Sequence, residues 1–365
     1  MERKLKVGIL GATGAVGQQF VRLLADHPWF EIAALAASSR SAGRPYREAT
    51  QWIGSEPIPE SVADMVVAET EPGLDCDVVF SGLDAKVAGE AERRFAEAGY
   101  GVISNARNYR MEADVPLLIP EVNPDHTALI ERQQWGSGGF IVTNPNCSTV
   151  GLVCALAPLE RAFGVDQVQV TTLQALSGAG YPGVSALDAL GNVVPFIGGE
   201  EDKLKTEPLK LLGTLRDGTI EPASITISAQ CNRVPVLNGH LECVSLKLRQ
   251  PADVQTVREA LAGFQSPIAD LDLPSAPAQF LHVFEEDHYP QPRRHANLGG
   301  GMTVSVGRLR PCEVLDVKFI VLSHNTIRGA AGGAVLNAEL LLRQGFLEEE
   351  ARGRGEEPAE LAVGR

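Results

Sequence analysis

The sequence predicts an α/β fold in which a parallel-sheet domain is followed by a second domain of α+β character with a mixed sheet. Short apolar runs alternate with helical patterns near the start, whereas the middle of the chain carries longer runs that alternate at period two. The length of 365 residues is sufficient for two domains, and 44% hydrophobic residues are sufficient for a core in each.

The first part of the chain has the pattern of repeated strand–helix units. The apolar segment 5–10 is expected to form a strand, followed by a glycine-rich turn and a helix over 15–27. A clear amphipathic helix is expected over 86–98. Because strands that alternate with helices form βαβ units, these elements predict a parallel sheet. Further strands of this sheet are expected at 31–37, 64–69, 75–83, 100–106 and 140–143.

The middle of the chain predicts a different sheet. Segments 165–176, 223–236 and 240–249 alternate between apolar and polar residues, which is typical of strands in a mixed or antiparallel sheet. Asn238-Gly239 lies between the last two segments and is a hairpin-type turn signal. We therefore expect a second domain with long strands.

The C-terminal part is expected to return to the first domain. A strand over 314–325 leads into a glycine-opened helix over 326–346, whose small-residue face favours packing on the first sheet. The charged, weakly patterned residues 348–365 are expected to be a mobile tail. The predicted domains are 1–146, completed by the C-terminal helix 325–347, and 147–324.

The composition argues against some classes of protein. The formal net charge of −14 disfavours non-specific nucleic-acid binding, which requires clustered Lys and Arg. No stretch approaches the about 20 apolar residues that span a bilayer, and the start lacks the long apolar stretch of a secretory signal. We therefore expect a cytoplasmic protein that binds neither a membrane nor a nucleic acid. The six cysteines form no CxxC pair and no Cys/His cluster of zinc type, so no metal site is predicted.

A glycine-rich turn follows the first predicted strand. The segment GATGAVG has the spacing GxxGxxG between a strand and a helix. Its glycines permit a tight turn and let the backbone reach a pyrophosphate, while the helix N-terminus offers free N–H groups to that anion. The turn therefore predicts a dinucleotide-binding, Rossmann-like domain; a turn used only for helix–sheet packing is the alternative. The expected cofactor-binding residues are Gly11, Thr13, Gly14, Ala15, Val16 and Gly17.

The end of the second predicted strand indicates the type of cofactor. An enzyme that uses NAD usually carries Asp or Glu here to bind the ribose 2′-hydroxyl. This chain has Ser38, Ser39, Arg40 and Ser41 instead. Hydroxyls and a cation suit a 2′-phosphate, so the sequence favours NADP over NAD. The alternative is that Arg40 is a solvated loop residue.

The junction around Cys147 predicts a nucleophile. A strand at 140–143 and a short turn precede Cys147, and a helix over 148–163 follows it. Asn146 is of the type that caps helices. The helix dipole is expected to lower the pKa of the Cys147 thiol, and the first backbone N–H groups are expected to stabilise an oxyanion. The other five cysteines are expected to be reduced, buried small side chains.

Several motifs resemble those of the aspartate-semialdehyde dehydrogenase family. They occur in order from about Lys6 to about Phe346, which is nearly the whole chain. The last three are most similar to the branch of the family found in archaea and fungi. The motifs are GATGAVG, ASSRSAG, SNARNYRMEADVPLLIPEVN, NPNCSTVG, LQALSGAGYPG, NVVPFIGGEE and CNRVPVLNGH.

The resemblance implies a role for each matching residue. Cys147 matches the nucleophile, Gln174 a residue that orients the substrate, and His240 the acid/base, whose place after an Asn-Gly turn predicts that it faces a cleft. Arg233 matches the group that pairs with the substrate α-carboxylate. The other substrate-binding residues implied are Arg110 and Lys203 for the phosphate, Glu200 for the ammonium, and Asn146. The other cofactor-binding residues implied are Ser81, Gly82, Ser177, Gly178 and Asn325, the last near the nicotinamide amide.

Two of these assignments stay open in the sequence. The run from residue 200 to 203 is Glu-Glu-Asp-Lys, so Glu201 could take the ammonium in place of Glu200. Lys205 could likewise replace Lys203 at the phosphate.

The resemblance implies an NADP-dependent enzyme that reduces L-aspartyl 4-phosphate to L-aspartate 4-semialdehyde, reversibly, through a thioester on Cys147. The reaction belongs to lysine, threonine and methionine biosynthesis, and the family forms homodimers or homotetramers. Two alternatives share the scaffold: a reductase of N-acetyl-glutamyl phosphate, and a reductase of malonyl-CoA or succinyl-CoA. A third alternative is an inactive homologue that acts as a binding protein.

Overall fold

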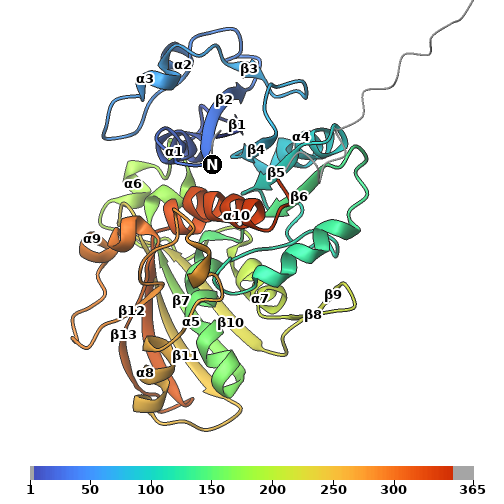
Figure 1. Ribbon diagram of the computed structural model, residues 1–365. Helices are drawn as coiled ribbons and strands as arrows, with labels where there is room; N and C mark the ends of the chain where they lie inside the picture. Colours follow the sequence, from blue (N-terminus) through green and yellow to red (C-terminus); the bar gives the residue numbers. More distant parts are fainter. Residues whose placement is uncertain (1–3, 348–365) are drawn as a thin grey trace, which may run out of the picture.

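The computed structural model describes residues 4–347 and contains two six-stranded sheets (Figure 1). The first sheet is parallel throughout, with the order β3-β2-β1-β4-β5-β6, so the predicted parallel sheet is confirmed. The tail predicted at 348–365 lies outside the described residues. The strands are β1 (Leu5–Leu10), β2 (Phe30–Ala37), β3 (Ala68–Glu69), β4 (Val78–Ser81), β5 (Gly101–Ser104) and β6 (Phe140–Thr143).

The central strands of this sheet are buried on both faces. Every residue of β4, β5 and β6 is buried, as expected of a parallel sheet that lies between layers of helix. Helices α1 (Ala15–Leu24) and α4 (Ala85–Glu97) supply apolar faces to the cores beside the sheet. The helix predicted at 86–98 is therefore confirmed to within one residue at each end.

The strand predicted at 64–69 is wrong in length. Only Ala68–Glu69 pairs with β2, as the short edge strand β3. Val66 instead forms an isolated antiparallel bridge with Pro45, and its side chain is exposed. The apolar run in this segment thus belongs to a loop that crosses the sheet edge.

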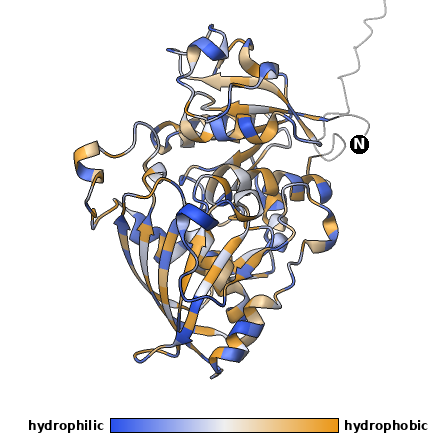
Figure 2. Ribbon diagram, turned by 90° about the vertical axis from the view of Figure 1, so that its left-hand side faces the viewer, coloured by the Kyte–Doolittle hydropathy of each residue, from blue (hydrophilic) through white to orange (hydrophobic). Residues whose placement is uncertain are grey.

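The second sheet is mixed, with the order β10-β7-β11-β14-β13-β12. The β7–β10 and β12–β13 pairs are parallel and the others antiparallel. Helices α5 (Cys147–Phe163) and α8 (Val254–Ala262) pack on one face and share its core. Figure 2 shows hydrophilic and hydrophobic residues alternating along these strands, which is the period-two pattern of the sequence. The strands are β7 (Val165–Gln174), β10 (Thr226–Arg233), β11 (His240–Leu248), β12 (Leu281–Val283), β13 (Val304–Pro311) and β14 (Val317–Ser323).

The Asn238-Gly239 turn does not join a hairpin, contrary to the sequence-based expectation. β10 and β11, which flank it, are separated in the sheet by β7. Gly239 does adopt the left-handed conformation that such turns need, with φ of 95°. The local signal for a turn was therefore right, but the partner strand comes from a distant part of the chain.

The helix predicted over 326–346 begins with an irregular turn. Residues Ile327–Ala331 form a π-helical turn, η5, with a kink at Ala330, and the regular helix α10 spans Gly332–Arg343. One side of α10 joins the core of the first sheet through Leu341 and Leu342. Its other side packs through Leu336 and Leu340 against loops of the second sheet. Figure 1 shows α10, in red, between the two sheets.

The remaining elements are short, except for one helix at the site. Within residues 4–347, no helix combines the length and apolar character needed to cross a membrane. The other helices are α2 (Tyr46–Ala49), α3 (Glu60–Ala63), α6 (Ala186–Ala189), α7 (Glu200–Leu211) and α9 (Pro292–His295). The 3-10 turns are η1 (Pro124–Arg132), η2 (Leu176–Ala179), η3 (Ala269–Leu271) and η4 (Leu298–Gly301), and β8 (Thr214–Arg216) pairs with β9 (Thr219–Glu221).

Candidate active site

Cys147 is the first residue of α5, directly after the turn that follows β6. Asn146 is the N-cap, and its Oδ1 accepts hydrogen bonds from the backbone N–H groups of Ser148 at 3.0 Å and Thr149 at 3.3 Å. Gly329 lies against the cysteine, because a Cβ added there would be 2.8 Å from the Cβ of Cys147. The predicted place of Cys147 is thus found, but two first-turn N–H groups expected for an oxyanion are occupied by the cap.

His240 lies directly behind the sulfur. It is the first residue of β11, and its Nε2 is 3.2 Å from Cys147 Sγ. The backbone N–H of Ala175 donates to His240 Nδ1 at 3.0 Å, so the neutral ring carries its proton on Nε2, facing the sulfur. The sequence predicted that His240 faces a cleft, and this is wrong. The imidazole is fully buried, because Cys147 and the turn after β7 cover it.

Burial dominates the protonation of this pair. It raises the pKa of Cys147 to about 12, with the Glu200 carboxylate adding to the effect and Lys203 opposing it. Burial, with Arg233 as the next cause, lowers the pKa of His240 to about 3. The expectation of a lowered thiol pKa is therefore wrong for the free site, because burial, the largest cause, raises it. Thiol and imidazole are both neutral near pH 7.

A carboxylate is anchored beside the thiol at the start of α7. Glu200 accepts hydrogen bonds from Asn146 Nδ2 at 3.1 and 2.9 Å and from Gln174 Nε2 at 3.3 Å, and it pairs with Lys203. Burial alone would raise the pKa of Glu200, but Lys203 and the amide donors hold it below its ordinary value. Glu200 is therefore a charged group that faces the sulfur.

The geometry separates the two pairs that the sequence left open. Glu200 and Lys203 line the cleft beside Cys147. Glu201 accepts a hydrogen bond from the backbone of Cys231 at 3.3 Å, away from the cleft, and Lys205 is exposed. The helical repeat explains this result, because residues three apart share a face of α7.

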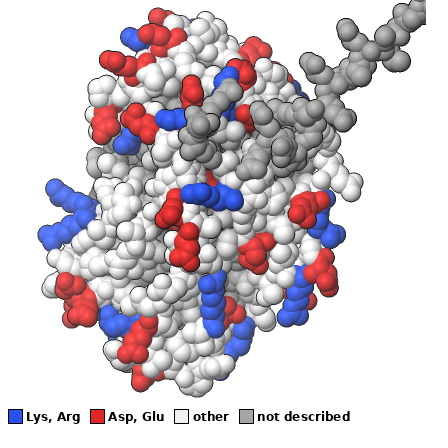
Figure 3. Space-filling view, in the orientation of Figure 1, with Lys and Arg blue, Asp and Glu red and all other residues white. Residues whose placement is uncertain are grey.

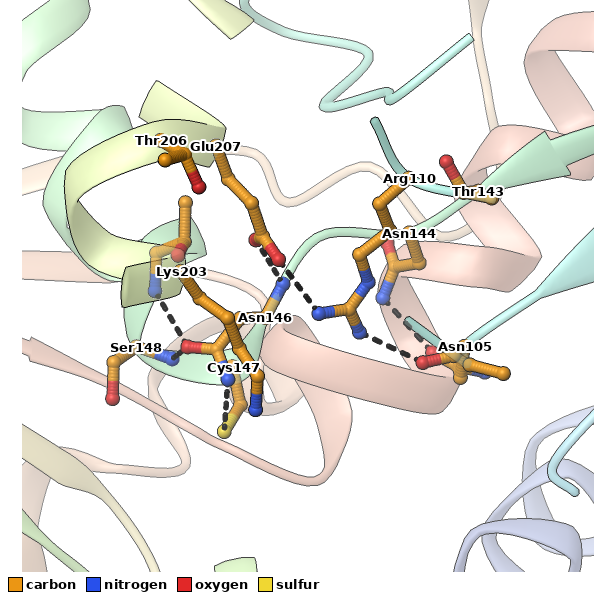
Figure 4. Close-up of polar contacts among 12 residues, drawn as sticks. Asn105, Arg110, Thr143, Asn144, Asn146, Cys147, Ser148, Lys203, Thr206 and Glu207 are labelled. Atoms are coloured by element: carbon orange, nitrogen blue, oxygen red, sulfur yellow. Dashed lines mark hydrogen bonds and ion pairs between the residues drawn. The ribbon is translucent and has the colours of Figure 1, made fainter. Parts of the chain in front are cut away.

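Two arginines complete the polar lining. Arg233, at the end of β10, donates from Nη1 to the carbonyl of Ala175 at 2.7 Å, and burial lowers its pKa. Arg110 donates to Glu207 at 2.9 Å and to the carbonyl of Asn105 at 2.8 Å (Figure 4). These groups line a cleft of about 500 Å³. The predicted catalytic and substrate-binding residues that line it are Arg110, Asn146, Cys147, Gln174, Glu200, Lys203 and Arg233.

Ser177 and Gly178 line the same cleft. A Cβ added to Gly178 would lie 2.7 Å from Arg233 Nη1 and 2.9 Å from His240 Cε1, so only glycine fits there. Asn325 donates to Ser177 Oγ at 2.9 Å and accepts from the Gly239 N–H at 2.9 Å. These three predicted residues therefore lie together at the cleft.

The predicted phosphate-binding turn leads from β1 to this cleft. Gly11 has φ of 74°, and a Cβ on Gly17 would be 2.2 Å from the Gly11 carbonyl oxygen, so both glycines are needed to close the turn. Gly14 is the N-cap of α1 without a side-chain cap, and a Cβ there would contact one described atom, at 3.3 Å. The first turn of α1 is thus open to a ligand. Thr13 lies in this turn, and Ala15 and Val16 line the cleft.

Some predicted cofactor residues lie away from the cleft. Ser38, Ser39 and Arg40 are exposed after β2, with Ser41 next to them, and they line no part of it. Ser81 is buried at the end of β4 and its Oγ has no hydrogen-bond partner among the described residues. Gly82 packs against the glycine turn, since a Cβ on it would be 3.1 Å from the Gly17 nitrogen.

On the face in Figure 3, acidic and basic side chains are interspersed over the surface.

The sequence analysis missed three residues at the site. Asn105 holds Arg110 through its carbonyl, Gly329 lets η5 contact Cys147, and Glu207 joins Arg110 to the backbone of Asn146. Glu207 had a usable signal, because it follows Glu200 by seven residues and so lies on the same face of α7.

Known proteins match the chain over almost its full length. Residues 6–130 match the family described as semialdehyde dehydrogenase, NAD binding domain, and residues 156–328 match semialdehyde dehydrogenase, dimerisation domain. An aspartate-semialdehyde dehydrogenase of Candida albicans is 51% identical over 355 residues, covering 92% of this chain and 97% of that protein. One of Archaeoglobus fulgidus is 50% identical over 344 residues, covering 93% and 99%.

Solved structures agree with these matches. The crystal structure of aspartate semialdehyde dehydrogenase with NADP from Candida albicans has a TM-score of 0.87 and 48% identity, and covers 93% of this chain and 99% of that one. Aspartate semialdehyde dehydrogenase II complexed with ASA from Vibrio cholerae has a TM-score of 0.74 and 28% identity, with the same coverage. The chain therefore belongs to the aspartate-semialdehyde dehydrogenase family.

Proposed function

We propose that the protein catalyses the reversible, NADP-dependent reductive dephosphorylation of L-aspartyl 4-phosphate to L-aspartate 4-semialdehyde. The observation that carries this function is the Cys147–His240 pair, 3.2 Å apart, whose cysteine lines a cleft that also holds separate cations and one anchored carboxylate. The related proteins of known structure include one with NADP and one complexed with ASA. On the basis of the same family membership, the product is proposed to serve lysine, threonine and methionine biosynthesis.

The charges of the cleft match those of the substrate. Glu200 is the anchored carboxylate and is proposed to bind the substrate ammonium. Arg233 is proposed to bind the α-carboxylate, and Arg110 and Lys203 the phosphate. An acetylated amine would not need Glu200, and a CoA thioester would not need both phosphate cations. The lining therefore favours the aspartyl substrate over N-acetyl-glutamyl phosphate and over malonyl-CoA or succinyl-CoA.

The glycine turn fits a dinucleotide phosphate. Gly14 leaves the first turn of α1 open, and no side chain among the described residues caps its N–H groups, so a pyrophosphate would meet free donors there. The residues proposed to hold NADP are Gly11, Thr13, Gly14, Ala15, Val16, Gly17, Ser81, Gly82, Ser177, Gly178 and Asn325, with Ser38, Ser39, Arg40 and Ser41 at the 2′-phosphate. When bound, NADP supplies or accepts the hydride.

Charge neutralisation is proposed to activate the thiol. The Glu200 carboxylate is one of the causes that raise the pKa of Cys147, so an ammonium bound to Glu200 removes part of that effect. His240 donates from Nε2 towards the sulfur and stabilises the thiolate. The thiol proton is proposed to pass to Nε2 of the tautomer that holds its own proton on Nδ1, which requires the ring to give up the hydrogen bond from the Ala175 N–H; the resulting imidazolium then donates from Nε2 to the thiolate.

The thiolate then attacks the acyl carbon, and phosphate leaves towards Arg110 and Lys203. A thioester on Cys147 divides one difficult reduction into two easier steps. Because Asn146 occupies the N–H groups of Ser148 and Thr149, the Cys147 N–H is the first-turn donor proposed for the oxyanion. Gln174, which contacts Glu200, is proposed to orient the substrate beside the sulfur.

The wider organisation is proposed on the same basis. Residues 1–146 with 325–347 form the cofactor-binding domain, and 147–324 form the catalytic and dimerisation domain. The packing of α10 on the first core and the match of 156–328 to a dimerisation domain support this division. We propose a homodimer or homotetramer in the cytoplasm.

The test is an initial-rate assay with aspartate semialdehyde, phosphate and NADP. N-acetyl-glutamate semialdehyde with phosphate and NADP, and malonyl-CoA with NADPH, serve as the comparison reactions. We expect activity with aspartate semialdehyde that requires phosphate. Activity with only one of the comparison substrates would reject the proposed substrate, and no activity with any of them would support an inactive homologue.

A further inference from the structure

Glu207 lies seven residues into α7, behind the groups that line the cleft (Figure 4). Its side chain is buried, and its two oxygens contact two different parts of the site. Oε1 accepts from Arg110 Nη1 at 2.9 Å, and Oε2 accepts from the backbone N–H of Asn146 at 2.7 Å. Both contacts are hydrogen bonds to a carboxylate, which are stronger than bonds between neutral groups.

We propose that Glu207 is a positioning residue that holds Arg110 and the backbone carrying Cys147 as one rigid unit. Phosphate binding at the arginine is thereby coupled to the position of the sulfur. The inference rests on the proposed function, because it requires an anion at Arg110 and a nucleophile at Cys147.

Arg110 is oriented before an anion arrives. Its Nη1 is held by Glu207 and its Nη2 by the carbonyl of Asn105, while its Nε is buried without a hydrogen-bond partner among residues 4–347. These two bonds use only two of the five N–H donors of the guanidinium, and Arg110 lines the cleft, so an anion there can be met by N–H groups that are already oriented. A guanidinium held on one side only would be free to turn, and the preorganised direction of these N–H groups would be lost.

The backbone at Asn146 is anchored by the same helix. Its N–H donates to Glu207 and its Nδ2 donates to Glu200, which lies about two turns earlier on the same face of α7. Cys147 is the next residue, so any shift of this backbone moves the sulfur relative to His240. A misplacement of about 1 Å at a reacting group is enough to cost about 10²-fold in rate.

A second contact from α7 supports the same unit. Lys210 lies three residues after Glu207 on the same face of the helix. Its Nζ donates to the backbone carbonyls of Arg110 at 2.9 Å, Glu112 at 2.6 Å and Val115 at 2.7 Å. Lys210 therefore fixes the main chain of the arginine loop while Glu207 fixes its side chain, and both come from the helix that also presents Glu200.

The test compares the wild type with Glu207→Gln, which is nearly isosteric. Gln has one acceptor oxygen in place of two, so it can serve Arg110 or the Asn146 N–H but not both. Asp202→Asn is the matched control, because it also removes one negative charge from α7 but from an exposed position. Steady-state rates with aspartate semialdehyde give KM for phosphate, KM for NADP and kcat for each protein.

A second measurement does not depend on turnover. Cys147 is alkylated with iodoacetamide at increasing concentrations of inorganic phosphate, and the protection by phosphate is recorded. We expect Glu207→Gln to raise KM for phosphate about tenfold or more and to lower kcat, with KM for NADP unchanged. Protection of Cys147 should require about tenfold more phosphate, in line with that KM. Asp202→Asn should match the wild type in all four measurements.

Wild-type phosphate KM and wild-type protection in Glu207→Gln would overturn the inference. A parallel rise in KM for phosphate and for NADP would also overturn it, because that result indicates a general loss of structure. If Glu207→Gln does not fold, Glu207→Asp replaces it in the test, because it keeps the charge on a shorter side chain. An unchanged KM for phosphate in Glu207→Asp would likewise overturn the inference. Absence of wild-type turnover with aspartate semialdehyde would reject the proposed function, and the alkylation measurement would still decide the role of Glu207.

Discussion

The buried ion pair between Glu121 and Arg328 allows a quantitative prediction. Two parallel hydrogen bonds of 2.7 and 2.8 Å join the carboxylate to the guanidinium, and both side chains are at most 2% exposed. Burial alone would lower the pKa of Arg328, but Glu121 holds it above its ordinary value, so the arginine stays charged. The pair also lies next to the catalytic region, since Gly329 contacts Cys147.

Glu121→Gln keeps the shape of the side chain but removes its charge. The guanidinium is then left buried without a counter-charge, a change that typically costs about 3–5 kcal/mol of unfolding free energy. At about 1.3 °C per kcal/mol for a chain of this size, Tm should fall by about 4–7 °C. Asp64→Asn is the control, because its pair with Arg47 is 2.8 Å long but exposed, and such pairs contribute about 0–1 kcal/mol.

Urea unfolding and differential scanning calorimetry measure these effects. The double variant Glu121→Leu/Arg328→Met should recover most of the loss, since replacing a buried pair by apolar residues is often neutral. A loss below about 1 kcal/mol in Glu121→Gln would refute the reasoning. A double variant as unstable as the single one would show that the lost stability does not come from the unpaired charge.

Three further outcomes are expected. Cys147→Ser should remove nearly all turnover and leave NADP binding intact by fluorescence titration; retained turnover would discard the covalent route. Glu242 is buried without a partner for either oxygen among the described residues, and burial raises its pKa well above 4.5. Above about pH 4.5 the Glu242 carboxyl group is thus protonated in the folded protein but ionised in the unfolded chain. The free energy of unfolding therefore falls as pH rises from about 4.5 through the pKa of the folded state. Glu242→Gln should therefore gain stability over the wild type between about pH 4 and pH 8 in urea titrations, and an advantage that stays constant would contradict this. Gly178→Ala should lower kcat by about 10²-fold, because the new Cβ would displace Arg233 and His240; unchanged kcat would show that the site accommodates it.

Local patterns in the sequence predicted local structure well. The apolar run at residues 5–10 coincides with β1, and the amphipathic segment at 86–98 with α4. The strand–turn–helix junction placed Cys147 at the start of α5, where the structure has it. These features depend on hydrophobic period and capping chemistry within a few residues, which is the information that one sequence carries.

Features that depend on distant parts of the chain could not be predicted in the same way. The Asn238-Gly239 turn indicated a hairpin, but β7 separates the two strands, because pairing is decided by the whole sheet. The direction in which the pKa of Cys147 shifts depends on burial of the thiol by segments such as η5 and the turn after β7. The sequence matched Glu200 but left Glu201 open, because only the packing of α7 shows which of the two faces the site.

The packing of α10 limits how the two halves of the molecule can move. Leu341 and Leu342 are inserted in the core of the first sheet, and Leu336 and Leu340 in a small cluster with Ile268, Leu273 and Met302 from loops of the second domain. A hinge motion that swung the halves apart would have to withdraw one of these pairs, at about 1.5–3 kcal/mol for each leucine exposed to water. Ligand entry that leaves α10 packed on both sides, by adjustment of surface side chains and short loops, should therefore cost less than such a hinge motion.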